Sequence, residues 1–217
     1  MKHKFKPESL MMTHAYRPEW SEGAIKCPIF QTSTFAFERA EEGKAFFEVA
    51  YGKREPIPNE KLGLIYSRIN NPDLEILERR LCLWDEADDC AVFESGMSAI
   101  TTVLLEFLAP GDLLVYSRPL YGGTDHFIHH FLTKMVIHVL GFRPGEEQDA
   151  LMDMIRESGY ADKLKLIYVE TPANPTNDLI DIEACRLVAD AFARAEDEVL
   201  VTVDNTYMGP LWQQPLQ

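Results

Sequence analysis

The sequence predicts an α/β fold in which a mostly parallel β-sheet carries helices on both faces. From residue 90 onward, short apolar runs of strand length alternate with longer amphipathic segments of helical period. Strands that are joined through helices run parallel, and parallel sheets are buried on both sides. The composition agrees, because a chain of 217 residues with 46% hydrophobic and 26% charged residues can bury a sizeable core.

Residues 1–65 do not share this alternation. They contain five prolines, a polar run at 52–61 and short apolar patches without a core-forming period. Such a segment buries too little apolar surface to fold alone. We therefore expect an extended arm or clasp over residues 1–65, or alternatively a disordered leader, followed by one large domain over residues 66–217.

The first helix of the large domain is expected to begin after Asn71, which can cap it. Pro72 suits the first turn, and Asp73 places a negative charge near the positive end of the helix. Apolar residues then recur at helical spacing, at Leu74, Leu77, Leu81 and Trp84. The acidic turn at 85–89 ends the helix.

Five strands and four more helices are expected after it. The short apolar runs place the strands at 90–93, 113–117, 136–140, 164–169 and 199–203. The helical patterns between them cover 97–108, 124–133, 148–157 and 181–195. Ligands of parallel α/β sheets bind at the carboxyl ends of the strands, so the residues that follow each strand are the candidates for function.

The charge and the cysteines exclude several classes of protein. A net charge of −14 would be repelled by nucleic acids and by anionic lipid surfaces. The four cysteines are scattered, without a C-x-x-C pair or zinc spacing, which indicates reduced thiols. The sequence has neither a secretory signal nor a run of roughly 18 apolar residues. We expect a cytoplasmic protein that binds neither nucleic acid nor membrane.

The turn that follows the expected strand at 90–93 consists of small residues and opens into a helix. Free N–H groups at a helix N-terminus, with Gly96 allowing close approach, suit a phosphate group, although a simple tight turn is the alternative. The turn matches none of the patterns G-x-G-x-x-G, G-x-x-x-x-G-K-[ST] or G-x-S-x-G. This removes the main support for a nicotinamide-dependent enzyme, a nucleoside triphosphatase or a serine hydrolase.

Two further strand ends carry candidate residues. Tyr121, beside a glycine pair, could lay its ring over a flat cofactor, or it could be a partly buried core residue before a helix cap. Asp204 lies at the end of a buried strand, where an acid is costly unless it is paired. It could hold a pyridinium nitrogen in its protonated form, or it could be an ordinary turn residue.

Three histidines, His126, His129 and His130, fall at helical spacing within one expected helix. That spacing can bind a metal ion, but the H-E-x-x-H context is missing. We therefore expect no metal site and place these histidines at the surface or at an interface.

Five motifs, in order and at similar intervals, resemble the Cys/Met-metabolism family of pyridoxal 5'-phosphate (PLP) enzymes. They are YSRINNP (66–72), ESGMSAI (94–100), YGGT (121–124), ETPANPT (170–176) and VDNT (203–206). The family includes cystathionine γ-synthase, cystathionine lyase, methionine γ-lyase and O-acetylhomoserine sulfhydrylase. The resemblance covers about residues 60–210 and implies the large domain of an aspartate-aminotransferase-like transferase of fold type I.

The resemblance implies a role for each matching residue. Gly96 and Met97 would give backbone N–H groups to the cofactor phosphate. Tyr66 and Arg68 would reach this phosphate from the neighbouring subunit of a homodimer or homotetramer. Arginine suits this role because its planar guanidinium binds a phosphate through two hydrogen bonds. Tyr121 would stack on the pyridine ring and take part in proton movement at the amine of the amino-acid substrate.

Two later strand ends complete the implied site. Asn174 would bind the phenolic oxygen of the ring, Asp204 would pair with the pyridinium nitrogen, and Thr206 would support the ring nearby. Asn70 stands where many relatives have glycine, and Asp73 stands where many have threonine. Neither of these two positions contacts the cofactor directly in the family.

The family's S-x-T-K motif, whose lysine forms the Schiff base with the cofactor, is absent. The lysines that are present lie in the arm or in the flanks of helices and strands, at positions 2, 4, 6, 26, 44, 53, 61, 134, 163 and 165. The large domain is therefore expected to be incomplete at its C-terminus, before the reacting lysine.

The activity implied by the resemblance is PLP-dependent elimination or replacement on a sulfur amino acid or an activated homoserine. One alternative is a catalytically inactive truncated chain or pseudoenzyme that acts at most through protein–protein association. A different α/β cofactor-binding module, such as a dehydrogenase, is disfavoured by the missing G-x-G-x-x-G motif.

Overall fold

The computed structural model describes residues 5–58, 60, 62–195 and 197–217. The chain forms two compact units, which meet in the sequence between Val92 and Phe93. The functional division into an arm of residues 1–65 and a large domain of residues 66–217 stays a prediction. Among the described residues, no helix has the length and apolarity that crossing a membrane requires.

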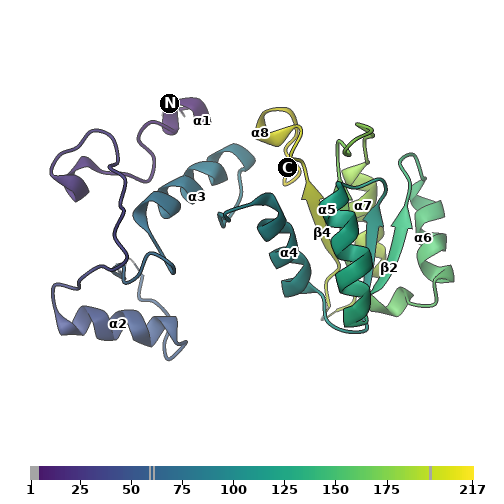
Figure 1. Cartoon of the computed structure of the whole chain (residues 1–217), viewed down its shortest axis with the longest axis horizontal. Helices are drawn as coiled ribbons and strands as arrows, with labels where there is room; N and C mark the ends of the chain where they lie inside the picture. Colours follow the sequence, from purple (N-terminus) through teal and green to yellow (C-terminus); the bar gives the residue numbers. More distant parts are fainter. Residues whose placement is uncertain (1–4, 59, 61, 196) are drawn as a thin grey trace. The chain divides into compact units, whose positions relative to one another are not determined.

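The unit of residues up to Val92 combines helices with long loops (Figure 1). Its helices are α1 (Pro7–Leu10), the 3-10 turn η1 (Pro18–Ser21), α2 (Ala40–Ala50) and α3 (Pro72–Asp85). The sequence pattern does not predict α2. The buried Phe46 of α2 contacts Phe47 within the helix and Phe37 outside it, with ring centroids 5.4 Å and 5.9 Å apart. A search for helical period within residues 40–50 misses such a contact.

Helix α3 begins and ends as the sequence predicts. The Asn71 side chain accepts a hydrogen bond from the Asp73 N–H (2.9 Å), and Pro72 occupies the first turn. Asn71 also donates to the carbonyl oxygen of Phe30 (3.1 Å), and the Asp73 carboxylate accepts from the Phe30 N–H (2.8 Å). The capping residues of α3 therefore also fasten a loop that is distant in the sequence.

The prediction of a strand at 90–93 is wrong, because these residues belong to no strand. The Val92 N–H donates instead to the Glu78 side chain of α3 (3.1 Å). A backbone group that a helix side chain satisfies does not need a neighbouring strand. The run has the composition of a strand, but its hydrogen-bond partner comes from a helix.

The unit from Phe93 onward is built on a four-stranded parallel sheet in the order β2-β1-β3-β4. The strands are β1 (Leu113–Ser117), β2 (His138–Phe142), β3 (Leu164–Glu170) and β4 (Leu200–Asp204). Ser117 pairs with Phe142, and Glu170 pairs with Asp204, so the carboxyl ends of the strands form one edge. The predicted parallel sheet is confirmed, although β2 begins later than the sequence predicts.

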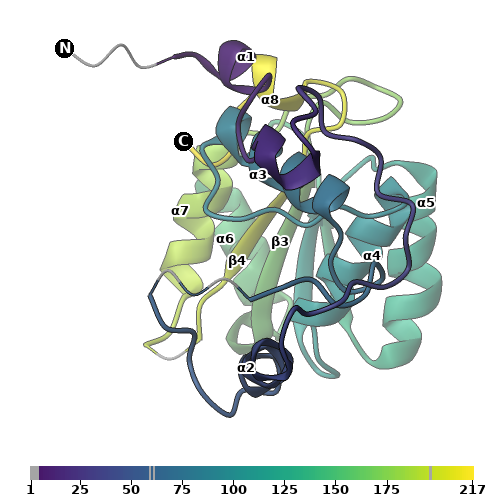
Figure 2. The same cartoon turned by 90° about the vertical axis from the view of Figure 1, so that its left-hand side faces the viewer.

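Helices cover both faces of this sheet, as predicted (Figure 2). On one face lie α4 (Gly96–Phe107) and α5 (Gly122–Phe127), which continues as the π-helix η2 (Ile128–Leu132). On the other face lie α6 (Gln148–Glu157) and α7 (Ile182–Phe192). The remaining short helices are η3 (Thr133–Met135), η4 (Ala161–Lys163) and α8 (Gly209–Trp212).

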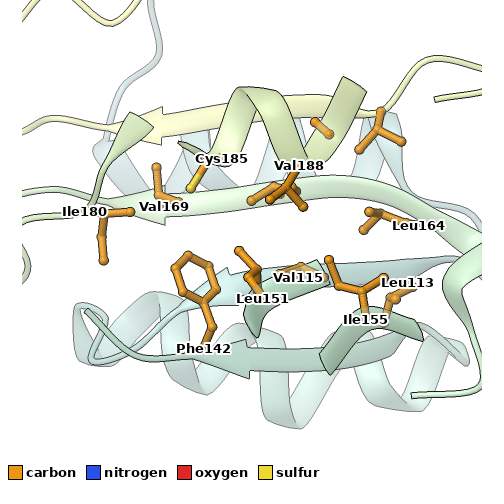
Figure 3. Packing of buried hydrophobic residues seen from close by; sticks show 13 residues of the cluster. Leu113, Val115, Phe142, Leu151, Ile155, Leu164, Val169, Ile180, Cys185 and Val188 are labelled. Carbon is orange, nitrogen blue, oxygen red and sulfur yellow. The ribbon is translucent and has the colours of Figure 1, made fainter. Parts of the chain in front are cut away.

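A hydrophobic core lies between the sheet and its helices on each face, because successive side chains of a strand point to opposite faces. Leu113 and Val115 of β1 belong to the core under α6 and α7, and Leu114 and Tyr116 belong to the core under α4 and α5. Figure 3 shows the first of these cores, with Phe142, Leu151, Val169, Cys185 and Val188 gathered around Val115. Close packing on both faces fixes the positions of the strand ends.

Candidate active site

Helix α4 opens with an exposed turn that Ser95 caps. Ser95 caps the helix by accepting a hydrogen bond from the Ser98 N–H (3.1 Å), and the Ser98 hydroxyl donates to Glu94 (2.7 Å). The N–H groups of Gly96 and Met97 lie in the first turn, where a helix provides no acceptor for them. A Cβ added at Gly96 would meet nothing within 4 Å, so the space beside this residue is open.

Tyr121 lies immediately before α5, and the residue is 46% exposed. This exposure distinguishes it from a core tyrosine. A Cβ added at Gly123 would lie 2.7 Å from Cε1 of the Tyr121 ring and 3.0 Å from the Met97 sulfur. Because Gly123 has no side chain, the Tyr121 ring and Met97 at the start of α4 can both lie close to its backbone.

Glu170, the last residue of β3, ties two loops of the site together. Its carboxylate accepts hydrogen bonds from the N–H of Tyr121 and from the N–H of Asn174, both at 2.7 Å. Its own N–H donates to the Ser117 hydroxyl (3.0 Å). The side chain is buried, and this burial raises the pKa of Glu170, while the two N–H bonds act against the rise.

Asp204, the last residue of β4, has both carboxylate oxygens engaged. Its Oδ1 accepts from the N–H of Thr206 (3.1 Å) and from the Thr206 hydroxyl (2.6 Å). Its Oδ2 accepts from the hydroxyl of Tyr168 on β3 (3.1 Å). Burial and the charge of Asp204 raise the pKa of the Tyr168 phenol, so the phenol remains a donor.

Contacts between side chains join these strand ends. The hydroxyl of the buried Thr124 lies 4.0 Å from the Met97 sulfur and also interacts with the Tyr168 hydroxyl. Tyr168 in turn reaches Asp204. The structure thus brings together, at the carboxyl edge of one sheet, the residues Gly96, Met97, Tyr121, Asn174, Asp204 and Thr206. A shared ligand pocket over these residues stays a prediction.

Tyr66 and Arg68 belong to the other compact unit. Tyr66 forms an antiparallel bridge with Thr34, and the Arg68 guanidinium lies 5.0 Å from the centre of the Tyr66 ring. Arg68 is exposed. The contact of these two residues with a cofactor phosphate stays a prediction.

The lysines of residues 93–217 lie away from the carboxyl edge. Lys134 is in η3, just before β2 begins, and Lys163 precedes β3 directly. Lys165 is the second residue of β3 and forms an ion pair with Asp197 ahead of β4. All three positions are near the amino ends of the strands, on the side opposite to the candidate site.

A family model described as "Cys/Met metabolism PLP-dependent enzyme" matches residues 8–217. The chain belongs to this family. The resemblance predicted from the five motifs is thereby confirmed, and with it the incomplete α/β large domain of a PLP-dependent enzyme.

Several relatives of the family can be compared with this chain. The L-methionine gamma-lyase of Pseudomonas deceptionensis is 33% identical over 100% of this chain and 49% of its own length. The cystathionine gamma-lyase of Homo sapiens is 27% identical over 91% of this chain and 42% of its own length. The chain spans about half the length of the curated relatives that it matches.

A solved structure supports the same assignment. It is a Campylobacter jejuni protein named as an O-acetylhomoserine (thiol)-lyase, with N'-pyridoxyl-lysine-5'-monophosphate in its chain. It matches with a TM-score of 0.79 and 29% identity, over 98% of this chain and 47% of that chain.

The residues that follow the strands were the candidates from sequence, and two residues of β3, Tyr168 and Glu170, were given no role of their own. Tyr168 supports Asp204, although its position within the apolar run 164–169 indicates only sheet core. Glu170 opens the ETPANPT motif, and it supports Tyr121 and Asn174. The available signal was their polarity, because a buried hydroxyl or carboxylate requires hydrogen-bond partners.

Proposed function

We propose that this chain is the cofactor-binding part of a PLP-dependent enzyme that acts on a sulfur amino acid or an activated homoserine by elimination or replacement. The observation that carries the proposal is the grouping, at one sheet edge, of donors and acceptors suited to different parts of PLP. An open helix start, a half-exposed aromatic ring and a firmly held carboxylate occupy this edge together. These groups fit the phosphate, the ring face and the ring nitrogen of PLP.

In this proposal the start of α4 and the loop before α5 hold the cofactor from two sides. The N–H groups of Gly96 and Met97 bind the phosphate, with the positive end of the α4 dipole behind them. The Tyr121 ring covers the pyridine face and its hydroxyl moves protons at the substrate amine. Glu170 keeps the Tyr121 loop in place through its hydrogen bond to the Tyr121 N–H.

The carboxyl ends of β3 and β4 supply the remaining contacts of the proposal. Asn174 donates a hydrogen bond to the phenolic oxygen of the ring. Asp204 accepts a hydrogen bond from the protonated ring nitrogen, and Thr206 holds the Asp204 carboxylate in place. A protonated pyridine ring, when bound, withdraws electrons from the substrate carbon that loses its proton. These residues would increase the reaction rate by holding the phosphate, the ring face and the ring nitrogen of PLP at the same time.

We also propose that the working enzyme is a cytoplasmic homodimer or homotetramer. Tyr66 and Arg68 would then bind the phosphate in the neighbouring subunit. The exposed guanidinium of Arg68, stacked on the Tyr66 ring, is available for such a contact.

The test measures the affinity of the purified chain for PLP, with the visible absorbance and fluorescence of the cofactor as the signals of binding. We expect Asp204→Ala to raise the Kd at least about tenfold, because a charge-assisted hydrogen bond contributes about 1.5–3 kcal/mol. Asp153→Ala, an exposed position on α6, is the matched control and should leave the Kd unchanged. A chain that does not bind PLP would contradict the proposal and favour an inactive chain acting through association.

A further inference from the structure

We propose that Tyr168 is a positioning residue that orients the Asp204 carboxylate toward the ring nitrogen of PLP. The inference rests on the proposed function, because it assigns a role within the same site. Tyr168 does not need to touch the cofactor for this task, since it acts through Asp204.

The Tyr168 hydroxyl is fixed in direction. The residue is 1% exposed, and its hydroxyl donates to Oδ2 of Asp204 over 3.1 Å, next to the buried Thr124. Burial and the negative charge of Asp204 raise the pKa of the phenol. The hydroxyl therefore keeps its proton at any ordinary pH and donates permanently.

Among the residues that the structure describes, the hydrogen bonds to the Asp204 carboxylate leave one acceptor position without a donor. An ionised carboxylate offers about four lone-pair positions. Thr206 fills two of them on Oδ1, and Tyr168 fills one on Oδ2. Because donors hold both oxygens, the carboxylate cannot turn freely, and its last position on Oδ2 is aimed in one direction. Only a donor, such as a protonated ring nitrogen, can occupy that position favourably.

Strand β1 offers a matched control residue. Tyr116 pairs with Tyr168 in the sheet register, belongs to the same core and is 2% exposed. Its hydroxyl forms a hydrogen bond with Nε2 of His129 (2.8 Å) rather than with Asp204. Tyr116→Phe therefore removes the same group from an equally buried ring without changing the donors of Asp204.

The first test compares the binding of PLP with that of an analogue in which a C–H group replaces the ring nitrogen. The unsubstituted chain should prefer PLP, and Tyr168→Phe should reduce this preference about tenfold, as expected for losing a hydrogen bond to a charged group. Tyr116→Phe should change the preference by less than about twofold. An equal loss of affinity for both ligands in Tyr168→Phe, or the same loss of preference in Tyr116→Phe, would overturn the proposal.

The second test needs no cofactor. In a double-mutant cycle followed by urea unfolding, Tyr168→Phe should lower the folding equilibrium constant about tenfold when Asp204 is present. The effect should shrink to less than about threefold in the Asp204→Ala background. Equal effects in both backgrounds would overturn the proposal. If the unsubstituted chain binds neither PLP nor the analogue, the proposed function fails, and the cycle still decides whether Tyr168 holds Asp204.

Discussion

Glu170 places a carboxyl group where water barely reaches it, since only 4% of the residue is exposed. Removing a carboxylate from water is costly unless hydrogen bonds replace the lost hydration. Here the N–H groups of Tyr121 and Asn174 donate to its two oxygens. The need to satisfy one buried acid thus fixes the backbone of two loops that carry candidate cofactor contacts.

Replacing Glu170 by glutamine should destabilise the chain. Two N–H groups each need an acceptor oxygen at this position, and the side-chain amide of glutamine has only one. One of the N–H groups of Tyr121 and Asn174 would lose its partner, at a cost of about 1–3 kcal/mol in the free energy of unfolding. Urea unfolding at neutral pH measures this difference. Glu157→Gln, at an exposed position on α6, is the control and should change the free energy by less than about 0.5 kcal/mol.

The free energy of unfolding should also depend on pH through the titration of Glu170. Burial is the largest cause that raises the pKa of Glu170 above its ordinary value of 4.5, and the charge of Asp204 adds to it against the N–H bonds. An acid with a raised folded pKa stabilises the fold below its unfolded pKa, and this contribution is lost as the pH rises through the folded pKa.

We therefore expect the unfolding free energy of the unsubstituted chain, relative to that of Glu170→Gln, to fall as the pH rises above about 4.5. Unfolding curves for both chains between about pH 4 and pH 8 test this. A difference that does not change with pH would mean that the pKa of Glu170 is the same in the folded and unfolded chains.

At the scale of elements, the start of α5 depends on a glycine pair with unequal surroundings. A Cβ at Gly123 would collide with the Tyr121 ring, whereas a Cβ at Gly122 would meet nothing within 4 Å. We expect Gly123→Ala to push the half-exposed ring out of its rotamer, at a cost of about 0.5–1.5 kcal/mol in PLP binding. The Kd for PLP measures this, with Gly122→Ala as the control. Equal Kd values for the two variants would contradict the packing of Tyr121 against Gly123.

Elements with a local signal could be predicted from the sequence, and those that depend on distant partners could not. Helix α3 has its cap, proline and apolar period within residues 71–85, and the strands of the sheet are dense apolar runs. Helix α2 relies on Phe37, which lies outside it. The run at 90–93 looks like a strand because composition does not reveal that Glu78 binds its backbone.

The site divides in the same way. Tyr121, Asn174 and Asp204 follow or end strands of a parallel sheet, so topology alone places them at one edge. Tyr168 is hidden among apolar neighbours in β3, and Glu170 opens a motif whose partners the sequence does not name. Only the hydrogen bonds of the folded chain reveal the partners of both residues. A sequence indicates which side chains need partners, and three-dimensional packing decides which partners they obtain.

At the scale of the whole molecule, β4 is one of the two edge strands of the sheet among the described residues, the other being β2. Strand β4 pairs with β3 on one side, and each of its five residues is only partly buried. Leu105 and Phe107 of α4 are also exposed, at 46% and 43%. An unpaired strand edge and apolar surface favour association with other chains. We expect the weight-average molar mass from light scattering to rise with the concentration of the purified chain, whereas a monomer mass at all concentrations would contradict this.

Catalysis by these 217 residues alone is a separate matter, because it requires an amine at the carboxyl edge of the sheet. Lys134, Lys163 and Lys165 lie near the opposite edge, so none of them can reach a cofactor held by Asp204. The sequence also lacks the S-x-T-K motif that carries the family's reacting lysine, so we expect PLP binding without turnover. Release of oxo acid and thiol from methionine, cystathionine, homocysteine and O-acetylhomoserine would be assayed, together with mass spectrometry after borohydride reduction. Turnover near the ordinary enzyme value of roughly 10 per second, with stoichiometric labelling of a single lysine, would contradict this expectation.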